Sequence, residues 1–480
     1  MRDYIEKEIQ AWLRSPERAA QITAARYLAG KHDILTRERR VIGRGGQLET
    51  SRNLPNNRLV DNQYGKLVRQ KVNYLTGRPF TFEGDAGAAL SLSRFFDKRR
   101  RRTIHSVCED AVSAGIGWLM PCFDGRGRFW LKRIPPYEIL PFWADGEHTV
   151  LDCAVRVYES EWNRKRVRRA EIYTPAGLSR YLLEGDKLLP GGNARMSGSG
   201  DGSGQGVSPL SDDAFAGGPW LSVNGRAWGW GKVPLVAFRS RGEESLLSRV
   251  KTLQDALNAL LSDFQNCLQE DARNTILVLK NYDGKDLAEF RHNLAAYGAV
   301  RVKTVDNTQG GVETLRVEVN HRSYEALSAM LKRAIVENGM GFDMRSELAR
   351  SAPNQMALLS MYSDVELDAH ALEAEWKASF EELLGFVRVG MMLESGVTLH
   401  AQRTLGAARP ADSQISPYPP CGAAEQLEVV FNRDMLMNES EIMRTLLQAG
   451  LRVSNESLLE QVPWVRDAGA EMERLRREQA

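Results

Sequence analysis

Long helical patterns fill most of the stretch between residues 243 and 395, and they limit the fold more than any other feature. In the first, residues 243–271, apolar side chains recur at steps of four and three, which keeps one stripe facing a helical partner. The stripe consists of Leu246, Val250, Leu253, Leu257, Leu260, Phe264 and Cys267. A third pattern runs from about Asn354 to Ser395, a rod about 60 Å long at 1.5 Å per residue. A chain with such long helices builds a frame rather than a pocket.

The second helix is predicted at 321–340, and short segments separate it from the other two. Its apolar side consists of Tyr324, Leu327, Leu331, Ala334 and Ile335. Residues 272–320 have the pattern strand, helix, strand, strand, with strands at NTILVLKNY, AVRVKT and VETLRVEV. Residues 341–353 form a connector that carries Arg345 and Arg350. Such a loop is either a plain connection or a segment placed to touch a ligand that runs along the helices.

The remainder of the chain predicts an α+β fold. Residues 1–40, 58–77 and 86–114 have helical spacing. From Gly117 onward, short runs alternate apolar and polar residues between turns, which predicts an antiparallel sheet with aromatic core residues. These are Trp118, Trp130, Phe142 and Trp143. A glycine-rich flexible loop is predicted at 186–218, and a strand with two or three helices near the C-terminus.

Charge and cysteine content exclude several function classes. Lys and Arg total 64 against 62 Asp and Glu, so the chain has no bulk attraction for nucleic acid, and any DNA contact has to be local. The five cysteines form no CxxC pair and no even framework, which is typical of a reducing cytoplasm. No apolar run approaches the length of a membrane span, and the N-terminus lacks a signal-peptide core. We therefore expect a soluble protein without a membrane partner.

The sequence contains no catalytic constellation. The glycines of WGWGKV (228–233) are misspaced for a phosphate loop, and Val233 stands where a magnesium-binding Ser or Thr is needed. The seven histidines occur singly, without an HExxH motif or a His–Cys spacing that would bind a metal. A lone histidine such as His105 or His370 is more often a core or surface residue than a catalytic one. We therefore expect no enzymatic activity, no cofactor and no metal.

Like charges cluster in three places. Basic runs lie at 98–102 (KRRRR) and 164–169 (RKRVRR), and the third helical pattern carries eight acids against two bases. The acids are Asp364, Glu366, Asp368, Glu373, Glu375, Glu381, Glu382 and Glu394. Each cluster can be a solvated face, or it can meet a complementary surface of another subunit or a phosphate backbone. Repetition of the subunit around an axis would pair opposite charges between neighbours, as rings do.

Several segments together resemble a known family, the portal proteins of tailed double-stranded DNA bacteriophages, of the type found in siphophages. The segments are RYLAGKHDIL (26–35), NNRLVDNQYGKLVRQKVNYLTGRPFTF (56–82), GKVPLVAF (231–238), LQDALNALLSDFQNCLQEDARNTILVLKNYDG (253–284), VFNRDMLMNESE (430–441) and LLEQVPWVRD (458–467). They span nearly the whole chain in the expected order. The glycine- and serine-rich insertion at 186–218 and the basic run at 98–102 depart from the family.

The resemblance implies a portal fold that assembles into a ring. Its parts would be a wing of helices and antiparallel sheet, a two-helix stem, a small α/β clip, a tunnel loop before a long helix, and a helical crown. In this chain they would be the wing at 1–242 and 354–431, the stem helices at 243–271 and 321–340, the clip at 272–320, the tunnel loop at 341–353, and the crown at 432–480. The family's rings have about twelve subunits, or about thirteen when isolated. The ring would stand at one capsid vertex of the virion after assembly in the bacterial cytoplasm.

The resemblance also implies residues and partners for DNA passage, non-specific and transient. The tunnel-loop candidates are Gly341, Phe342, Asp343, Met344, Arg345, Ser346, Glu347, Arg350 and Pro353, and the channel-lining stem candidates are Lys332, Arg333 and Glu337. Clip candidates, which would contact the terminase large subunit and later the head-completion adaptor, are Lys280, Tyr282, Asp283, Lys303 and Asp306. Scaffold and the major capsid protein are further implied partners, and ATP hydrolysis would belong to the terminase.

Two other classes of protein remain as alternatives. One is a capsid or tail building block without a DNA channel, which the same long helices could build. The other is a DNA-processing enzyme subunit, such as a nuclease or helicase component. The missing metal-ligand and nucleotide-binding motifs argue against the enzyme.

Overall fold

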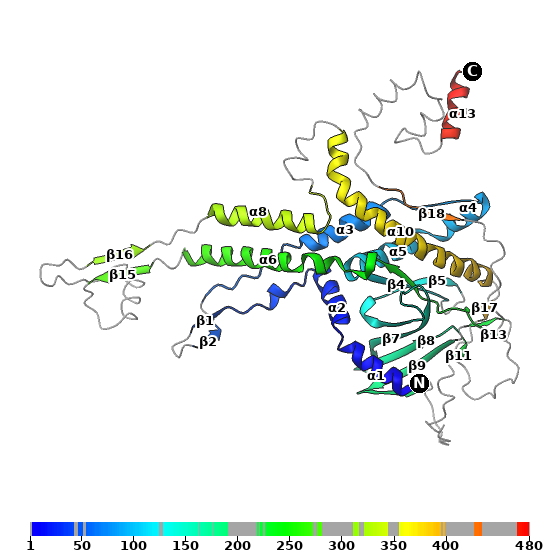
Figure 1. Ribbon diagram of the computed structural model, residues 1–480, viewed down its shortest axis with the longest axis horizontal. Coiled ribbons are helices and arrows are strands. Elements are labelled where there is room, and N and C mark those ends of the chain that lie inside the picture. The colour runs from blue at the N-terminus through cyan, green and yellow to red at the C-terminus, as the bar shows by residue number, and fades with distance from the viewer. Residues whose placement is uncertain are drawn as a thin grey trace. The chain divides into compact units, whose positions relative to one another are not determined.

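The computed structural model divides into two compact units. Unit 1 comprises residues 1–29, 64–249 and 336–480, and unit 2 comprises residues 30–63 and 250–335. The structure describes residues 2–42, 47–50, 54–123, 128–162, 164–175, 177–190, 218–219, 221–223, 226–271, 276–280, 311–315, 321–343, 355–394, 397–398, 427–433 and 468–479. Figure 1 labels the elements.

The helices follow the predicted patterns closely. Those of unit 1 are α1 (Arg2–Leu13), α2 (Pro16–Leu28), α3 (Gln63–Thr76), α4 (Ala86–Phe95), α5 (Lys98–Ala114), α10 (Gln355–Leu393) and α13 (Ala468–Gln479), with 3₁₀ turns η2 (Pro136–Glu138) and η4 (Arg241–Glu243). Unit 2 holds η1 (Asp33–Thr36) and most of α6 (Leu246–Asp271) and α8 (His321–Asn338). The three long helices expected between residues 243 and 395 are thus present.

All strand pairs described in the structure are antiparallel. The largest sheet has the order β10-β9-β8-β7-β6, from β6 (Ile139–Trp143), β7 (Leu151–Trp162), β8 (Lys165–Tyr173), β9 (Gly177–Glu184) and β10 (Lys187–Pro190), with β11 (Gly218–Pro219) on β9. A three-stranded sheet has the order β14 (Val236–Arg239), β4 (Ile116–Phe123) and β5 (Phe129–Ile134). A second has the order β13 (Arg226–Trp228), β12 (Leu221–Val223) and β17 (Val397–Thr398). A two-stranded sheet pairs β18 (Glu428–Val430) with β3 (Thr81–Glu83). In unit 2, β1 (Arg40–Ile42) pairs with β2 (Leu48–Thr50), and β15 (Ile276–Lys280) with β16 (Gly311–Leu315).

The largest sheet buries side chains on both faces. Val155 and Val157 of β7 pack in one cluster with Ile9 and Trp12 of α1. Ala154, the neighbour of Val155 in the strand, packs in a second cluster with residues of β4 and β5. Successive residues of a strand point to opposite faces, so α1 covers one face and the β14-β4-β5 sheet the other. The predicted antiparallel sheet is confirmed; of its four predicted core aromatics, Trp118 is buried, and Trp130, Phe142 and Trp143 are half-buried.

Helix α10 is a packed helix of unit 1. It spans 39 residues, which confirms the predicted long third helix. Phe380 is fully buried, and its ring centre lies 5.1 Å from that of Phe80, 5.6 Å from Phe238 and 5.7 Å from Phe431, each edge to face. Edge-to-face pairs add attraction beyond the buried area. Because these partners lie beside β3, in β14 and beside β18, the cluster draws three distant chain segments onto α10.

The basic run at 98–102 is partly used inside unit 1. The Arg100 guanidinium lies 4.1 Å from the Phe95 ring centre and donates to the carbonyl oxygens of Phe95 (2.9 Å) and Phe129 (3.1 Å). Arg101 lies over the Phe80 ring and donates to the Phe96 carbonyl. These two arginines therefore hold the start of α5 against aromatic neighbours, whereas Lys98, Arg99 and Arg102 are exposed.

In the second basic run, cross-strand carboxylates stand opposite the arginines. The register of β7 and β8 sets Arg168 opposite Glu159 and Arg166 opposite Glu161. The Arg168 and Glu159 side chains are 3.4 Å apart and exposed. Opposite charges at facing strand positions attract, so part of this run is neutralised by its own hairpin.

Unit 2 contains a buried ladder of polar side chains on α6. Gln254, Asn258, Ser262 and Asn266 are four residues apart, and none is more than 2% exposed. They bond the backbone of residues 57–61: Asn266 Oδ1 accepts from Asn57 N (2.8 Å), Ser262 Oγ from Leu59 N (2.9 Å) and Asn258 Oδ1 from Asp61 N (3.0 Å), while Gln254 Nε2 donates to Asp61 O (2.7 Å). The segment runs antiparallel to the helix.

The ladder works because two structural repeats nearly coincide. Four residues of an α-helix rise about 6.0 Å, and two residues of extended chain cover about 6.6 Å. Every second amide of residues 57–61 therefore meets every fourth side chain of α6. Residues 57–61 belong to no described strand, and the ladder supplies the partners that their backbone groups need when buried.

The segment between α6 and α8 is described in part. Strands β15 and β16 confirm the predicted strands at 274–282 and 312–319, and they pair with each other. The predicted strand at 299–304 lies outside the described residues. Between the two flanking helices, Phe264 of α6 stacks on Tyr324 of α8 with ring centres 4.7 Å apart.

Replacement Asn258→Ala should lower the free energy of unfolding by about 1–3 kcal/mol, because it leaves the Asp61 amide without its acceptor. Urea unfolding at a fixed protein concentration measures this. Thr252→Ala, at an exposed position of the same helix, is the control and should change the free energy by less than about 0.5 kcal/mol. Equal effects of the two substitutions would show that the ladder does not stabilise the unit.

Candidate functional site

The start of α6 is held by a tight approach between backbone segments of unit 1. Ser240 N donates to the Gly115 carbonyl at 3.0 Å, and Ser240 Oγ donates to the Glu244 carbonyl at 2.7 Å. Gly115 ends α5 with a φ of 90°, and a Cβ there would clash with the Glu243 carbonyl. Only glycine fits this conformation and this distance. The end of α5 thereby fixes the turn from which α6 begins. We name this turn and the first residues of α6 the helix foot (residues 240–249).

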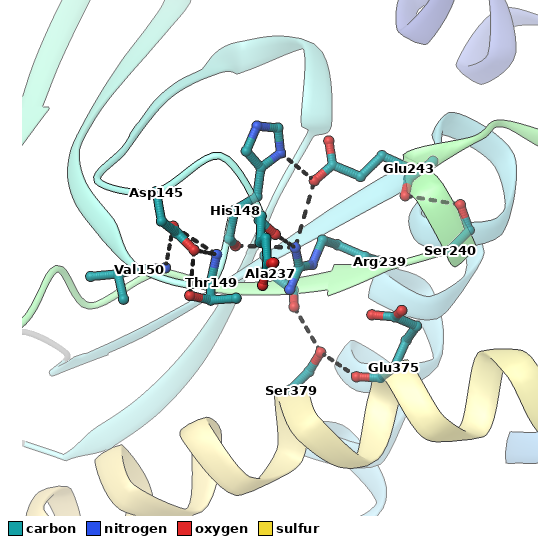
Figure 2. A network of polar contacts seen from close by, with 12 residues as sticks. Asp145, His148, Thr149, Val150, Ala237, Arg239, Ser240, Glu243, Glu375 and Ser379 are labelled. Atoms are coloured by element: carbon teal, nitrogen blue, oxygen red, sulfur yellow. Dashed lines mark hydrogen bonds and ion pairs between the residues drawn. The ribbon is translucent and has the colours of Figure 1, made fainter.

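Side chains from the β6–β7 turn reach the helix foot (Figure 2). His148 Nδ1 lies 2.9 Å from Glu243 Oε1, and its ring stacks on Trp143 with centres 5.0 Å apart. Arg239 of β14 donates to the His148 carbonyl at 3.0 Å and lies 3.8 Å from the Glu243 carboxylate. The foot is therefore tied to the sheet by charge as well as by backbone.

Asp145 closes the same turn. Its carboxylate accepts from Thr149 N at 2.9 Å and from Val150 N at 3.0 Å, and Figure 2 shows both bonds. Hydrogen bonds from the Thr149 side chain and these amides lower the pKa of Asp145 to about 2. Bonds to the charged form favour it, so the carboxylate stays ionised at neutral pH.

The residues just before the 344–353 segment are docked on α3, and we name residues 340–343 the loop root. The Gln70 side-chain amide donates to the Phe342 carbonyl (2.7 Å) and accepts from the Phe342 amide (3.0 Å), as a neighbouring strand would. Phe342 is 6% exposed. Gly341 lies close to Leu67 of α3, and a side chain at this position would require the Leu67 and Gln70 side chains to move.

One buried lysine bonds the chain on both sides of the loop. Lys71 Nζ donates to the Met340 carbonyl at 3.1 Å and to Asp368 Oδ2 at 2.6 Å. Met340 precedes the loop, and Asp368 belongs to α10, which follows it. The Lys71 side chain is 3% exposed, and burial lowers its pKa while Asp368 acts in the opposite direction. A single ammonium therefore joins the residue before the 341–353 connector to α10, the helix that follows the connector.

The helix foot and the loop root meet at one cavity of about 370 Å³ in unit 1. Arg249 lies 2.7 Å from the Glu244 carboxylate and 3.9 Å from that of Asp368, which also binds Lys71. The charges thus alternate along Glu244, Arg249, Asp368 and Lys71. Paired in this way, buried or partly buried ions avoid the cost of an isolated charge.

Other acids of α10 also pair within the chain. Glu366 bonds the Tyr74 hydroxyl and Arg433, and Glu373 bonds Arg433 and Lys377. Together with Asp368, these acids form ion pairs with bases of unit 1; all three are among the seven acids of α10. Part of the acidic pattern therefore serves to pack the helix.

The structure places only some of the residues predicted from the sequence. Met344, Arg345, Ser346, Glu347, Arg350 and Pro353 lie outside the described residues, as do Tyr282, Asp283, Lys303 and Asp306. Asp343 lies at the loop root, 3.7 Å from Lys66, and Lys280 ends β15 opposite Gly311. Lys332 forms an ion pair with Asp61 at 2.9 Å within unit 2, whereas Arg333 and Glu337 are exposed.

Gln70 and Lys71 hold the loop root but were not among the predicted site residues. The position of Lys71 in the sequence could have indicated its burial. Lys71 lies four residues after Leu67 and three after Val68, on the apolar side of the predicted helix. A charged residue on that side has to find a buried partner. Its partner, Asp368, is distant in the sequence, so the sequence alone could not identify it.

Within the described ranges, no three His, Cys, Asp or Glu side chains are grouped as a metal ion would require. None of the described helices has the length and apolar character that a bilayer crossing demands. The described geometry is that of anchored helices and a docked loop root.

Comparison with known proteins identifies the class. Residues 14–480 match the family described as "Phage portal protein, SPP1 Gp6-like". The portal protein of Bacillus phage SPP1 is 24% identical over 467 residues, which cover 95% of this chain and 83% of that protein. The portal protein of Clostridium phage phiCD119 is 24% identical over 381 residues, 76% of this chain and 77% of that protein.

The chain belongs to the SPP1 Gp6-like family of phage portal proteins. Portal proteins are structural components of the phage capsid and serve in DNA packaging. The resemblance seen in the sequence is thereby confirmed, and so is the α+β class with its helices and antiparallel sheet.

Replacement Lys71→Met should destabilise the protein by about 3–5 kcal/mol, because it leaves the partly buried carboxylate of Asp368 without its main partner. The double variant Lys71→Met with Asp368→Leu should recover most of this loss. Urea unfolding gives the free energies, and hydrogen exchange of the Phe342 amide reports on the loop root. Lys66→Met, on the same helix but about half exposed, is the control and should cost less than about 1 kcal/mol.

Proposed function

We propose that this chain is the subunit of a closed ring through which double-stranded DNA enters the phage head during packaging and leaves it at ejection. The match of residues 14–480 with the portal family carries the proposal, because it includes both units. Head-to-tail contacts that close on themselves give such rings, here with about twelve subunits. The ring would occupy one capsid vertex and assemble with scaffold and the major capsid protein.

In this assignment unit 1 supplies most of the wing and unit 2 most of the stem and clip. The wing comprises residues 1–242 and 354–431, the crown residues 432–480, and the clip residues 272–320. Helices α6 (Leu246–Asp271) and α8 (His321–Asn338) fall within the ranges 243–271 and 321–340 that we assign to the two stem helices, which supports the assignment. The helix foot supports this role, since it ties the first stem helix to the wing sheet within unit 1.

The charge arrangement supports a passage with weak DNA binding. DNA has to slide in both directions, and every neutralised phosphate adds affinity that would hold it in place. The chain is nearly neutral, and Lys332 is already paired with Asp61. We therefore assign transient DNA contact to Arg345 and Arg350, in a tunnel loop that begins from the docked loop root. Arg333 and Glu337 are the stem residues proposed to line the channel.

The first test is electron microscopy of the purified chain with native mass spectrometry. Closed rings with a pore wide enough for duplex DNA are expected. A poreless or irregular oligomer would instead support a capsid or tail building block without a channel.

Replacing Arg345 and Arg350 together with Ala should reduce packaging or the retention of packaged DNA, because the loop loses its positive charges. Packaged DNA length and the number of DNA-filled heads are measured in an assembly reaction. Arg94→Ala with Arg180→Ala, two exposed arginines of unit 1, is the control. Unchanged packaging and retention would remove the assigned role.

Replacing Tyr282 and Lys303 with Ala should weaken the stimulation of the terminase ATPase and binding of the head-completion adaptor. The reason is that these two residues, with Lys280, Asp283 and Asp306, are proposed to form that contact. Steady-state ATPase assays and pull-down with the adaptor measure it. The clip assignment fails if the double variant stimulates and binds like the original protein while its rings are intact.

A further inference from the structure

Three bases at the start of α5 form one exposed patch. Lys98, Arg99 and Arg102 are exposed, and at about 100° per residue they fall within an arc of about 100° around the helix. The guanidinium groups of Arg100 and Arg101 instead lie over aromatic rings of unit 1. We name Lys98, Arg99 and Arg102 the α5 basic patch.

Few carboxylates balance the α5 basic patch. Asp97 accepts from Arg100 N at 2.9 Å as the helix cap, and its carboxylate lies 3.6 Å from the Arg100 guanidinium. The next acid along α5 is Glu109, about 10 Å beyond Arg102 at 1.5 Å per residue. Charges at that distance are largely screened, because the Debye length is about 8 Å at physiological salt. Among the described residues, no ion pair involves Lys98 or Arg102.

The placement of these bases works against the helix that carries them. The first turn of a helix has a positive partial charge, which favours acids and disfavours bases such as Lys98. Lys98 and Arg102 are also four residues apart, a spacing at which like charges repel each other. Local choices that oppose the fold in this way are typical of functional positions. The α5 basic patch therefore needs a reason outside the stability of the subunit.

The composition of the patch suits phosphate groups better than a protein surface. Protein interfaces have apolar, aromatic cores that are depleted of charge. Helix α5 is described throughout, and none of its large apolar side chains is exposed. The Arg99 guanidinium lies 5.0 Å from the Trp130 ring centre, which restricts its orientation, and its forked donors match phosphate oxygens. Among polyanions we choose DNA, a choice that rests on the proposed function.

We propose that the α5 basic patch binds the phosphate backbone of double-stranded DNA without reading its sequence. It is a second DNA contact, carried by unit 1 and distinct in the chain from Arg345 and Arg350. Three bases give few phosphate contacts per subunit, so binding by one copy is weak and falls with salt. Repetition of the patch in a ring multiplies the contacts available to a long DNA molecule.

The test neutralises two of the bases and measures DNA binding. Lys98→Gln with Arg102→Gln is made in an Arg345→Ala, Arg350→Ala background, so that the loop arginines do not contribute. Fluorescence anisotropy with a short DNA duplex of mixed sequence gives the binding constant at several salt concentrations. The slope of log K against log salt should become smaller by about 2, because each lost phosphate contact removes about 0.9.

Thermal unfolding of the same variant provides a second readout. The variant should unfold at the same temperature as its background or at a higher one, since it lacks the charges that oppose the helix. Purely structural bases would give the reverse result, a lower unfolding temperature with an unchanged salt slope. Lys7→Gln with Arg14→Gln, two exposed bases of unit 1, removes the same charge and should leave the slope unchanged.

A competition experiment distinguishes DNA from an acidic protein. Extended polyglutamate has one charge per about 3.3 Å, against one per about 1.7 Å in duplex DNA, so at equal charge it should displace DNA poorly. Efficient displacement would assign the patch to an acidic protein and overturn the proposal, as would an unchanged salt slope. Electron microscopy of the same samples separates the two hypotheses. Closed rings with an unchanged slope overturn the patch alone, whereas a reduced slope without rings supports the patch and contradicts the ring.

Discussion

The buried polar ladder on α6 is the interaction on which unit 2 depends. A helix normally buries an apolar stripe, but here Gln254, Asn258 and Ser262 are fully buried and bond an irregular segment. The bonds satisfy backbone groups that would otherwise have to be exposed to water. They also fix the register of the segment on the helix, since a shift by one residue would turn each amide away. A polar contact of this kind resists sliding better than an apolar one.

A buried polar side chain also holds the loop root in unit 1. Lys71 is buried, yet its ammonium finds a carbonyl before the loop and a carboxylate after it. The cost of burying the charge is offset only while both partners stay in place. The same carboxylate of Asp368 faces Arg249 at the helix foot. Movement of the loop root would therefore disturb the ion pairs at the start of α6, within the same unit.

Helix α8 is less buried in its first half than the other two long helices are along their packed faces. The other two long helices find partners inside the chain: α6 its polar ladder and α10 the phenylalanine cluster around Phe380. In α8, by contrast, most positions from 321 to 330 are exposed, including two large apolar residues. Long helices obtain most of their stability from packing rather than from intrinsic propensity. In the proposed ring, neighbouring copies would supply this helix with further packing.

Much of the fold could be predicted from the sequence because periodicity is a local property. The spacing of apolar residues located α6, α8 and α10, and alternation located the antiparallel sheet. The stripe on α6 was only partly right as a guide to burial: Leu257 is buried, whereas Leu253 and Phe264 are half-buried. The buried ladder was missed because polar residues at four-residue spacing predict a solvated face until a partner is known. The basic run at 98–102 could not be interpreted further without knowing that Phe80, Phe95 and Phe129 lie beside it.

The sequence by itself determined the elements, the α+β class and the resemblance to portal proteins, since all of these are written in the order of residues along the chain. The tertiary structure alone decided which side chains meet: Gln70 with Phe342, Lys71 with Asp368, and Asn258 with Asp61. Each of these contacts joins residues that are separated by about two hundred positions or more in the chain, so no local pattern encodes it. They are selected only when folding brings a buried polar group next to the one partner that can satisfy it.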